Sequence, residues 1–109
     1  MDRKKLGKAN RQKGYRVEHK IVNMFNQKGL KAIRVPLSGG TQFQKGDIII
    51  GDYDDKYMIA EVKSRKEGFG TIYKFLGDND LLIIHTNRKE PLVVMSFDKF
   101  VELARTFLK

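Results

Sequence analysis

Three charged residues interrupt a pair of apolar segments that are predicted to be neighbouring strands. Asp47 opens an isoleucine run, and Glu61 and Lys63 follow the apolar run 57–60. If the polar string between the runs is a turn centred on Asp54, paired residues have numbers that sum to 108, so Asp47 lies opposite Glu61. Side chains directly opposed on antiparallel strands point to one face, about 4.5–5.5 Å apart. Alternation along the strand adds Lys63 to that face.

Such a cluster has a definite chemistry. Two ionised carboxylates about 5 Å apart repel each other by roughly 3 kcal/mol at an effective dielectric constant near 20. Lys63 offsets part of this, and a divalent cation would offset more, because Mg²⁺, with Mn²⁺ as a substitute, prefers hard oxygen ligands. A metal ion there could orient a phosphodiester, help to deprotonate water and stabilise the leaving oxyanion. The alternative is that both acids are solvent-facing strand ends, with Lys63 as an ordinary ion-pair partner.

The composition limits the partners of such a site. A chain of 109 residues is the size of one domain, and its 22 Lys and Arg against 13 acids give a charge of +9, which favours nucleic acid. The absence of cysteine excludes disulfides, thiol nucleophiles and thiolate metal sites. No apolar run approaches the roughly 20 residues of a membrane span, and the first residues lack the apolar core that a secretory signal has. We expect an intracellular protein, in the cytoplasm or on the nucleoid, with no membrane partner and no small-molecule cofactor.

The remaining pattern predicts the elements that position the cluster. Residues 1–10 read as a basic arm, and residues 11–109 as a single domain. We expect a helix from about Arg11 to Lys28, a strand at 31–35, a loop at 36–41, the hairpin described above, a brief helix at 71–76 and strands at 81–84 and 92–95. A last helix follows Ser96 as N-cap, and its apolar face comprises Phe97, Phe100, Val101, Ala104, Phe107 and Leu108. The order predicts an α/β fold with a mixed, mostly antiparallel five-stranded sheet flanked by helices.

Two further groups of charged residues belong with the cluster. Glu18 lies at the margin of the apolar side of the first helix, where it could reach the sheet or pair with a basic residue one turn away. Basic residues are expected to neutralise phosphates, although those of the arm could instead form a charged tail. The expected DNA-binding residues are Arg3, Lys4, Lys5, Lys8, Arg11, Lys13, Arg34, Lys45, Arg65 and Lys66.

These motifs in order resemble a known family. Asp47, a spacer of thirteen residues and then Glu61-Val62-Lys63 are similar to the core motif of PD-(D/E)xK nucleases. More narrowly, the chain resembles the archaeal-type Holliday-junction resolvases. The likeness begins near Gly14 with G-Y-R-V-E and passes through I-R-V-P-L-S-G-G, G-D-I-I-I and A-E-V-K-S-R-K to Ile72-Tyr73, so it covers most of the chain.

The resemblance implies a restriction-endonuclease-like core and a homodimer that makes paired nicks in four-way DNA junctions with Mg²⁺. Asp47 and Glu61 would be metal ligands and Lys63 the catalytic lysine. Glu18 would reach the same metal from the first helix, and Ser38 would be a loop hydroxyl needed for activity. The chain departs from the family in having only a short segment after Lys66 for the next helix, which affects how two copies associate. A dimer is still expected, because one chain offers one site and two symmetric cuts need two.

Alternatives remain open at this stage. The nuclease could act on duplex, flap or single-stranded DNA, or the chain could be a non-catalytic nucleic-acid-binding module. Ser38 precedes two glycines, as serine does in many flexible loops. Phe69 and Tyr73 are assigned to the core or to an interface rather than to base stacking.

Overall fold

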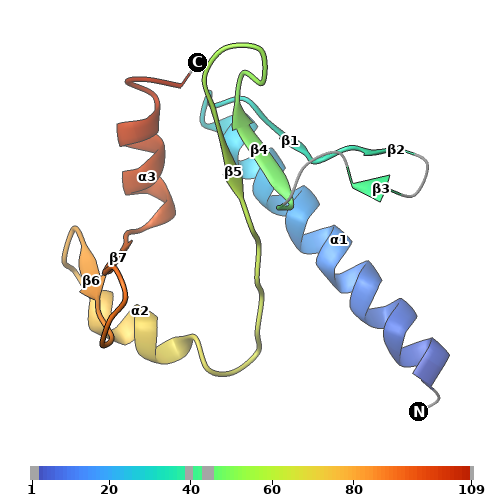
Figure 1. Cartoon of the computed structure of the whole chain (residues 1–109), viewed down its shortest axis with the longest axis horizontal. Helices are drawn as coiled ribbons and strands as arrows, with labels where there is room; N and C mark the ends of the chain where they lie inside the picture. The colour runs from blue at the N-terminus through green and yellow to red at the C-terminus, as the bar shows by residue number, and fades with distance from the viewer. Residues whose placement is uncertain (1–2, 39–40, 43–45, 109) are drawn as a thin grey trace.

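The computed structural model describes the backbone of residues 3–38, 41–42 and 46–108 and the side chains of residues 14–36 and 46–108. The order of elements in these ranges matches the expected order, with two additional short strands (Figure 1). The elements are α1 (Arg3–Gln27), β1 (Ala32–Arg34), β2 (Leu37–Ser38), β3 (Thr41–Gln42), β4 (Ile48–Gly51), β5 (Tyr57–Ala60), α2 (Gly70–Leu76), β6 (Leu82–Ile84), β7 (Leu92–Val94) and α3 (Phe97–Ala104).

Helix α1 is longer than the apolar pattern predicts. It begins at Arg3 rather than near Arg11, so the basic segment 3–10 is helical and continuous with the rest. Lys, Arg, Leu and Ala dominate this segment and are strong helix formers even without an apolar stripe. The N-terminal turns extend away from the sheet (Figure 1). No helix in the described ranges is long and apolar enough to cross a membrane.

The hairpin has the predicted register. Strands β4 and β5 pair antiparallel with Ile48 opposite Ala60 and Gly51 opposite Tyr57, and β1 pairs with the other edge of β4. The sheet order is therefore β1-β4-β5. Paired residues in β4 and β5 sum to 108, as predicted, and Asp47 and Glu61 are the residues next to the last pair, Ile48 and Ala60.

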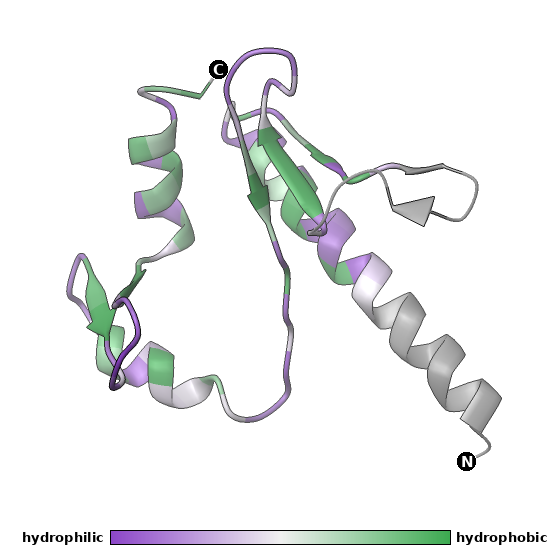
Figure 2. Ribbon diagram, in the orientation of Figure 1, coloured by the Kyte–Doolittle hydropathy of each residue, from purple (hydrophilic) through white to green (hydrophobic). Residues whose placement is uncertain are grey.

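The core lies between this sheet and two helices. Val22 and Phe25 of α1 are buried, as are Ile48 and Ile50 of β4, and α3 packs on the same cluster through Val101 and its apolar neighbours. Helix α1, helix α3 and the sheet are hydrophobic where they meet (Figure 2). The hairpin turn and the connection after β5 are mostly hydrophilic. The Ser96 hydroxyl accepts the Lys99 N–H, which confirms the predicted N-cap. Phe107 was wrongly placed on the buried face: it follows the end of α3 and is exposed.

The prediction of a single five-stranded sheet was wrong. Every pairing in the described part of the chain is antiparallel, and β6 and β7 pair only with each other, in a sheet separate from β1-β4-β5. Residues 36–41 were expected to be a loop, but Leu37–Ser38 and Thr41–Gln42 form the small β2–β3 ladder. The α/β class is confirmed, and α2 with β6 and β7 forms a unit beside the core (Figure 1).

Candidate active site

Asp47 is held by both strands that flank β4. Its backbone N–H donates to the Ala60 carbonyl at 2.8 Å, and its carbonyl accepts the Val35 N–H at 2.9 Å. Its side-chain Oδ2 accepts the Val62 N–H at 2.7 Å. The carboxylate is thereby fixed against the segment that carries Glu61 and Lys63, which lie on either side of Val62 in the sequence.

Gly46 permits this close approach. It has φ of 98°, and a Cβ at this position would collide with the Ile59 side chain and lie 3.3 Å from the Ala60 carbonyl oxygen. Both the left-handed backbone and the missing side chain are properties of glycine. The dipeptide Gly46-Asp47 is therefore what brings the chain into β4 with the carboxylate directed at β5.

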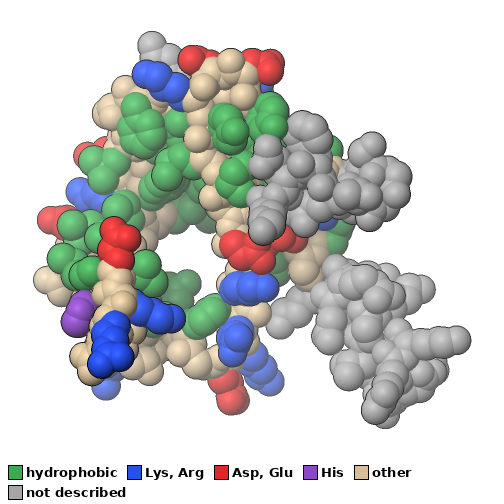
Figure 3. Space-filling model, viewed as in Figure 1, with side chains coloured by type: hydrophobic (Ala, Val, Ile, Leu, Met, Phe, Trp, Pro, Cys, Tyr) green, Lys and Arg blue, Asp and Glu red, His purple; other side chains and the backbone are tan. Residues whose placement is uncertain are grey.

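Glu61 and Lys63 lie just beyond the end of β5. Lys63 Nζ is 3.3 Å from Glu61 Oε1, and both side chains are more than half exposed. An exposed pair of this kind contributes little to stability, because water screens it and two long side chains must be ordered. Acidic side chains gather at this end of the hairpin, and basic side chains follow directly along the connection to α2 (Figure 3). The charged groups of Glu61 and Lys63 are therefore accessible to an incoming ligand and do not belong to the core.

Glu18 has a partner that its position on α1 alone did not predict. Arg34 of β1 donates from Nε to Glu18 Oε2 at 2.8 Å, and the Glu18 side chain is only 17% exposed. The Arg34 guanidinium carbon also lies 4.1 Å from the centre of the Tyr15 ring, which stacks on His19. Glu18 therefore faces the sheet, as the helix pattern predicts, but is bound to a residue sixteen positions away rather than to one a turn away.

The donor set at the end of the hairpin fits a hard divalent cation. Asp47 uses Oδ2 for the Val62 N–H, and in the described part of the chain no hydrogen bond engages its Oδ1. Glu61 engages only Oε1 with Lys63 among the described residues. Carboxylate oxygens are ligands that Mg²⁺ accepts together with water. Across residues 14–36 and 46–108, no three His, Cys, Asp or Glu side chains gather closely enough to hold a metal. Glu18 therefore does not form a three-carboxylate group with Asp47 and Glu61 in this structure.

Several expected site residues can be placed only in part. Ser38 ends β2 with its backbone paired to Thr41, but its side chain is outside the described residues, as is all of Lys45. The Arg65 guanidinium carbon lies 5.7 Å from the Phe69 ring centre, and Lys66 is exposed. The helix α1 carries the backbone of the remaining basic residues, whose side chains are also outside the described set: Arg3, Lys4, Lys5, Lys8, Arg11 and Lys13.

Two contributors were missed in the sequence. Tyr15 supports Arg34, and its spacing of three from Glu18 does place both on one side of α1, which was a usable signal. The Val62 N–H that holds Asp47 had no signal, because the backbone of a Val between two charged residues carries no distinguishing side chain.

A comparison with known proteins agrees with this geometry. No solved structure matches the chain. The family model described as archaeal Holliday junction resolvase (Hjc) matches residues 9–98, a range that contains Glu18, Arg34, Asp47, Glu61 and Lys63. Members of this family are endonucleases of DNA recombination and repair. The chain belongs to the archaeal Holliday junction resolvase family.

Proposed function

We propose that this protein resolves four-way DNA junctions through a metal site formed by Asp47 and Glu61. The observation that carries the proposal is the bond from the Val62 N–H to Asp47, which fixes one carboxylate beside the strand that bears the other. A Mg²⁺ ion bound by the two carboxylates would activate water and stabilise the leaving oxyanion. The helix α1 with β1, β4 and β5 is then the catalytic half of a restriction-endonuclease-like core.

Each charged residue has a role in this scheme. Asp47 and Glu61 bind the metal through oxygen, and Lys63 places positive charge beside the scissile phosphate, where charge develops during cleavage. Glu18 contributes an acid from α1, which Arg34 orients through the 2.8 Å bond. Ser38 contributes a hydroxyl from the β2–β3 segment. Water is the nucleophile, because among the described side chains no pair of nucleophile and base would support a covalent intermediate.

DNA binding is assigned to the positive charge that surrounds these acids. The N-terminal turns of α1, Lys45 and the segment after Lys63 would neutralise phosphates, which makes the affinity depend on salt. Two symmetric cuts in one junction need two copies of the site, so the active species is a homodimer. The protein acts where the cell keeps its DNA.

The direct test of this function is a gel assay with labelled four-way junction, flap and linear duplex in Mg²⁺. Asp47→Asn keeps an oxygen that can accept the Val62 N–H but removes the charge, so nicking should fall by at least about a hundredfold. Junction binding should persist, because the basic surface is intact. The matched control is Asp52→Asn, since Asp52 Oδ1 likewise accepts a backbone N–H, from Asp54 at 2.9 Å, but at the turn end of the same hairpin.

The outcomes separate the rival functions. Equal cleavage of junction and duplex would favour a nuclease of broader substrate range. Absence of nicking by the wild-type protein in both Mg²⁺ and Mn²⁺, with binding indifferent to either ion, would identify a non-catalytic binding module. Loss of binding together with nicking in a folded Asp47→Asn protein would contradict the assignment of Asp47 as a metal ligand.

A further inference from the structure

The outer side of α1, which is turned away from the sheet, carries a row of polar side chains without partners. Four residues recur at spacings of four, three and four, which aligns them along one face of the helix: Arg16, Lys20, Asn23 and Gln27. All four are exposed, and in the described part of the chain none of them makes a hydrogen bond or an ion pair. Asn26 differs, because its side-chain amide bonds to the backbone of β1. This outer row is therefore free to bind a ligand.

A hollow of about 530 Å³ lies along the outer row, and the described residues that line it all belong to α1. Tyr15 and His19 line one side of it, with their rings stacked 5.3 Å apart. Arg, Lys, Asn, Gln and Tyr side chains all donate hydrogen bonds to the phosphates and sugars of DNA, and none of the described residues that line the hollow is acidic. At about 1.5 Å per residue the row is roughly 16 Å long, which spans about five nucleotides of one DNA strand. The hollow therefore suits a DNA backbone.

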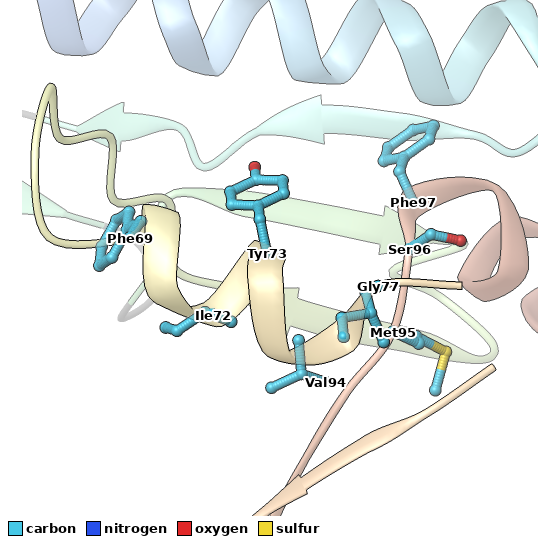
Figure 4. Close-up of a pocket in the computed structure, with 9 residues that line it drawn as sticks. Phe69, Ile72, Tyr73, Gly77, Val94, Met95, Ser96 and Phe97 are labelled. Atoms are coloured by element: carbon cyan, nitrogen blue, oxygen red, sulfur yellow. The ribbon is translucent and has the colours of Figure 1, made fainter. Parts of the chain in front are cut away.

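A second hollow of similar size has a different character. It measures about 540 Å³ and lies between α2 and the start of α3, where Tyr73 and Phe97 project at its edge (Figure 4). None of the described residues that line it is charged, and the Ser96 hydroxyl already accepts the Lys99 N–H. A phosphate gains no ion pair there, so this hollow does not compete with the outer row for DNA.

The positive charge of α1 is not balanced within the helix. Its only acid is Glu18, whose carboxylate is already paired with a side chain of β1. Arg16 and Lys20 are one turn apart, and like charges at this spacing destabilise a helix. By contrast, Lys28, directly after the helix, lies 3.2 Å from Asp98. The outer row therefore costs stability in the free protein, and a polyanion bound along it would remove that cost.

Glu18 lies on the opposite side of α1 from the outer row. At about 100° per residue it is roughly 160° around the helix from Arg16, and its side chain faces the sheet and is only 17% exposed. A helix with its side chains is about 10–12 Å thick, so DNA on the outer row is separate from DNA at Asp47 and Glu61. A linear duplex is stiff over about 150 base pairs and would have to bend sharply to reach both places. The arms of a four-way junction diverge from one branch point and can reach both without such a bend.

We propose that the outer row holds a second, uncut arm of the junction and thereby supplies a preference for branched over linear DNA. The inference rests on the proposed function, because one arm must occupy the end of the hairpin that carries Asp47 while another lies along α1. The second arm would continue along the basic N-terminal turns of the same helix (Figure 1). The preference then comes from backbone contacts made in two places, without any reading of base sequence.

The experiment measures binding by fluorescence anisotropy in EDTA, so that no strand is cut. The full chain is titrated into a labelled four-way junction and into a linear duplex of the same sequence. Arg16→Gln with Lys20→Gln removes two charges and keeps good helix formers. Its junction affinity should fall roughly tenfold or more, and the salt slope should become shallower by up to about 2 units. Its duplex affinity should fall far less, because the duplex can still bind at the Asp47 end of the hairpin.

The matched control is Lys56→Gln with Lys74→Gln, which removes the same charge at two exposed positions outside α1. This control should leave the ratio of junction affinity to duplex affinity unchanged. Circular dichroism checks that both double variants fold.

Three results would overturn the inference. Equal weakening of junction and duplex binding by the Arg16 and Lys20 variant would make the outer row a general charged surface. An unchanged junction affinity would show that no DNA lies on the row. A wild-type protein that binds junction and duplex equally would have no preference for the row to supply.

Nicking of the junction in Mg²⁺ is measured separately and decides the proposed function. A wild-type protein that nicks junctions, with a variant that keeps the full junction preference, would contradict the role of the outer row alone. A wild-type protein that does not nick, with a variant that loses the preference, would support the outer row and contradict the catalytic proposal.

Discussion

At the scale of single residues, the site combines one contact that sequence can predict with one that it cannot. The predicted opposition of Asp47 and Glu61 follows from a short turn and period-two alternation, both local properties, and the structure confirms the hairpin register from Ile48 opposite Ala60 to Gly51 opposite Tyr57. The pairing of Glu18 with Arg34 depends on how α1 lies across β1, which no local pattern specifies. Arg34 was expected to bind phosphate, and in the structure it already has a carboxylate and an aromatic ring as neighbours.

The Glu18–Arg34 pair can be measured by a double-mutant cycle. Arg34→Met keeps the length of the side chain but leaves Glu18, largely buried, without its partner, so the free energy of unfolding should fall by about 1–2 kcal/mol after allowance for the partial exposure of Arg34. Glu18→Gln combined with Arg34→Met should restore part of this loss, since the two residues interact directly. Urea unfolding of the four proteins gives the coupling free energy.

The matched control for this cycle is the pair Lys28 and Asp98, which is bridged at 3.2 Å but exposed on both sides. Its coupling should be near zero, as is usual for surface ion pairs. Strict additivity of Glu18→Gln and Arg34→Met would mean that the bond does not orient Glu18.

At the scale of elements, the sequence predicts each local unit well and its extent less well. Apolar periodicity locates the helices and strands, and capping chemistry fixes the start of α3 at Ser96. The same periodicity misses residues 3–10 of α1, because a helix that projects from the core needs no apolar stripe. It also misses β2 and β3, whose two-residue ladder is too short to show alternation.

The helical basic segment makes a specific prediction for DNA binding. Replacing Lys4, Lys5 and Lys8 together with Gln keeps good helix formers but removes three positive charges, so junction affinity should fall. The slope of log affinity against log salt should become shallower by up to about 3 units, while the cut position stays the same. Fluorescence anisotropy over a salt series measures the slope. Lys56→Gln, at the exposed turn of the β4–β5 hairpin, is the control, and an equal slope for the two variants would show that the segment does not contact DNA.

At the scale of the whole molecule, the chain is more open than a compact domain of its length. Its radius of gyration is 16.0 Å, against about 13 Å expected for 100 residues in one compact unit. The α2–β6–β7 unit stands beside the core with an opening between them (Figure 3). Sequence reasoning assumed that all five main strands share one sheet, because strand propensity says which segments are extended but not which edges meet.

The core and the candidate site nevertheless lie in the segments whose helices and strands the sequence predicts. The three-stranded sheet and the two helices packed on it come from the segments with the clearest apolar patterns. The family match over residues 9–98 is consistent with this, since it extends from α1 to the start of α3. What the sequence left undetermined is that β6 and β7 form a sheet separate from β1-β4-β5.

The central claim is that Asp47 and Glu61 bind one divalent ion together. Crystals of the protein soaked in Mn²⁺ and measured for anomalous scattering test it most directly. We predict a peak between the two side chains, within about 2.0–2.3 Å of an oxygen from each. A map with no peak there, or an ion bound by one of these carboxylates while the other turns away, would contradict the account.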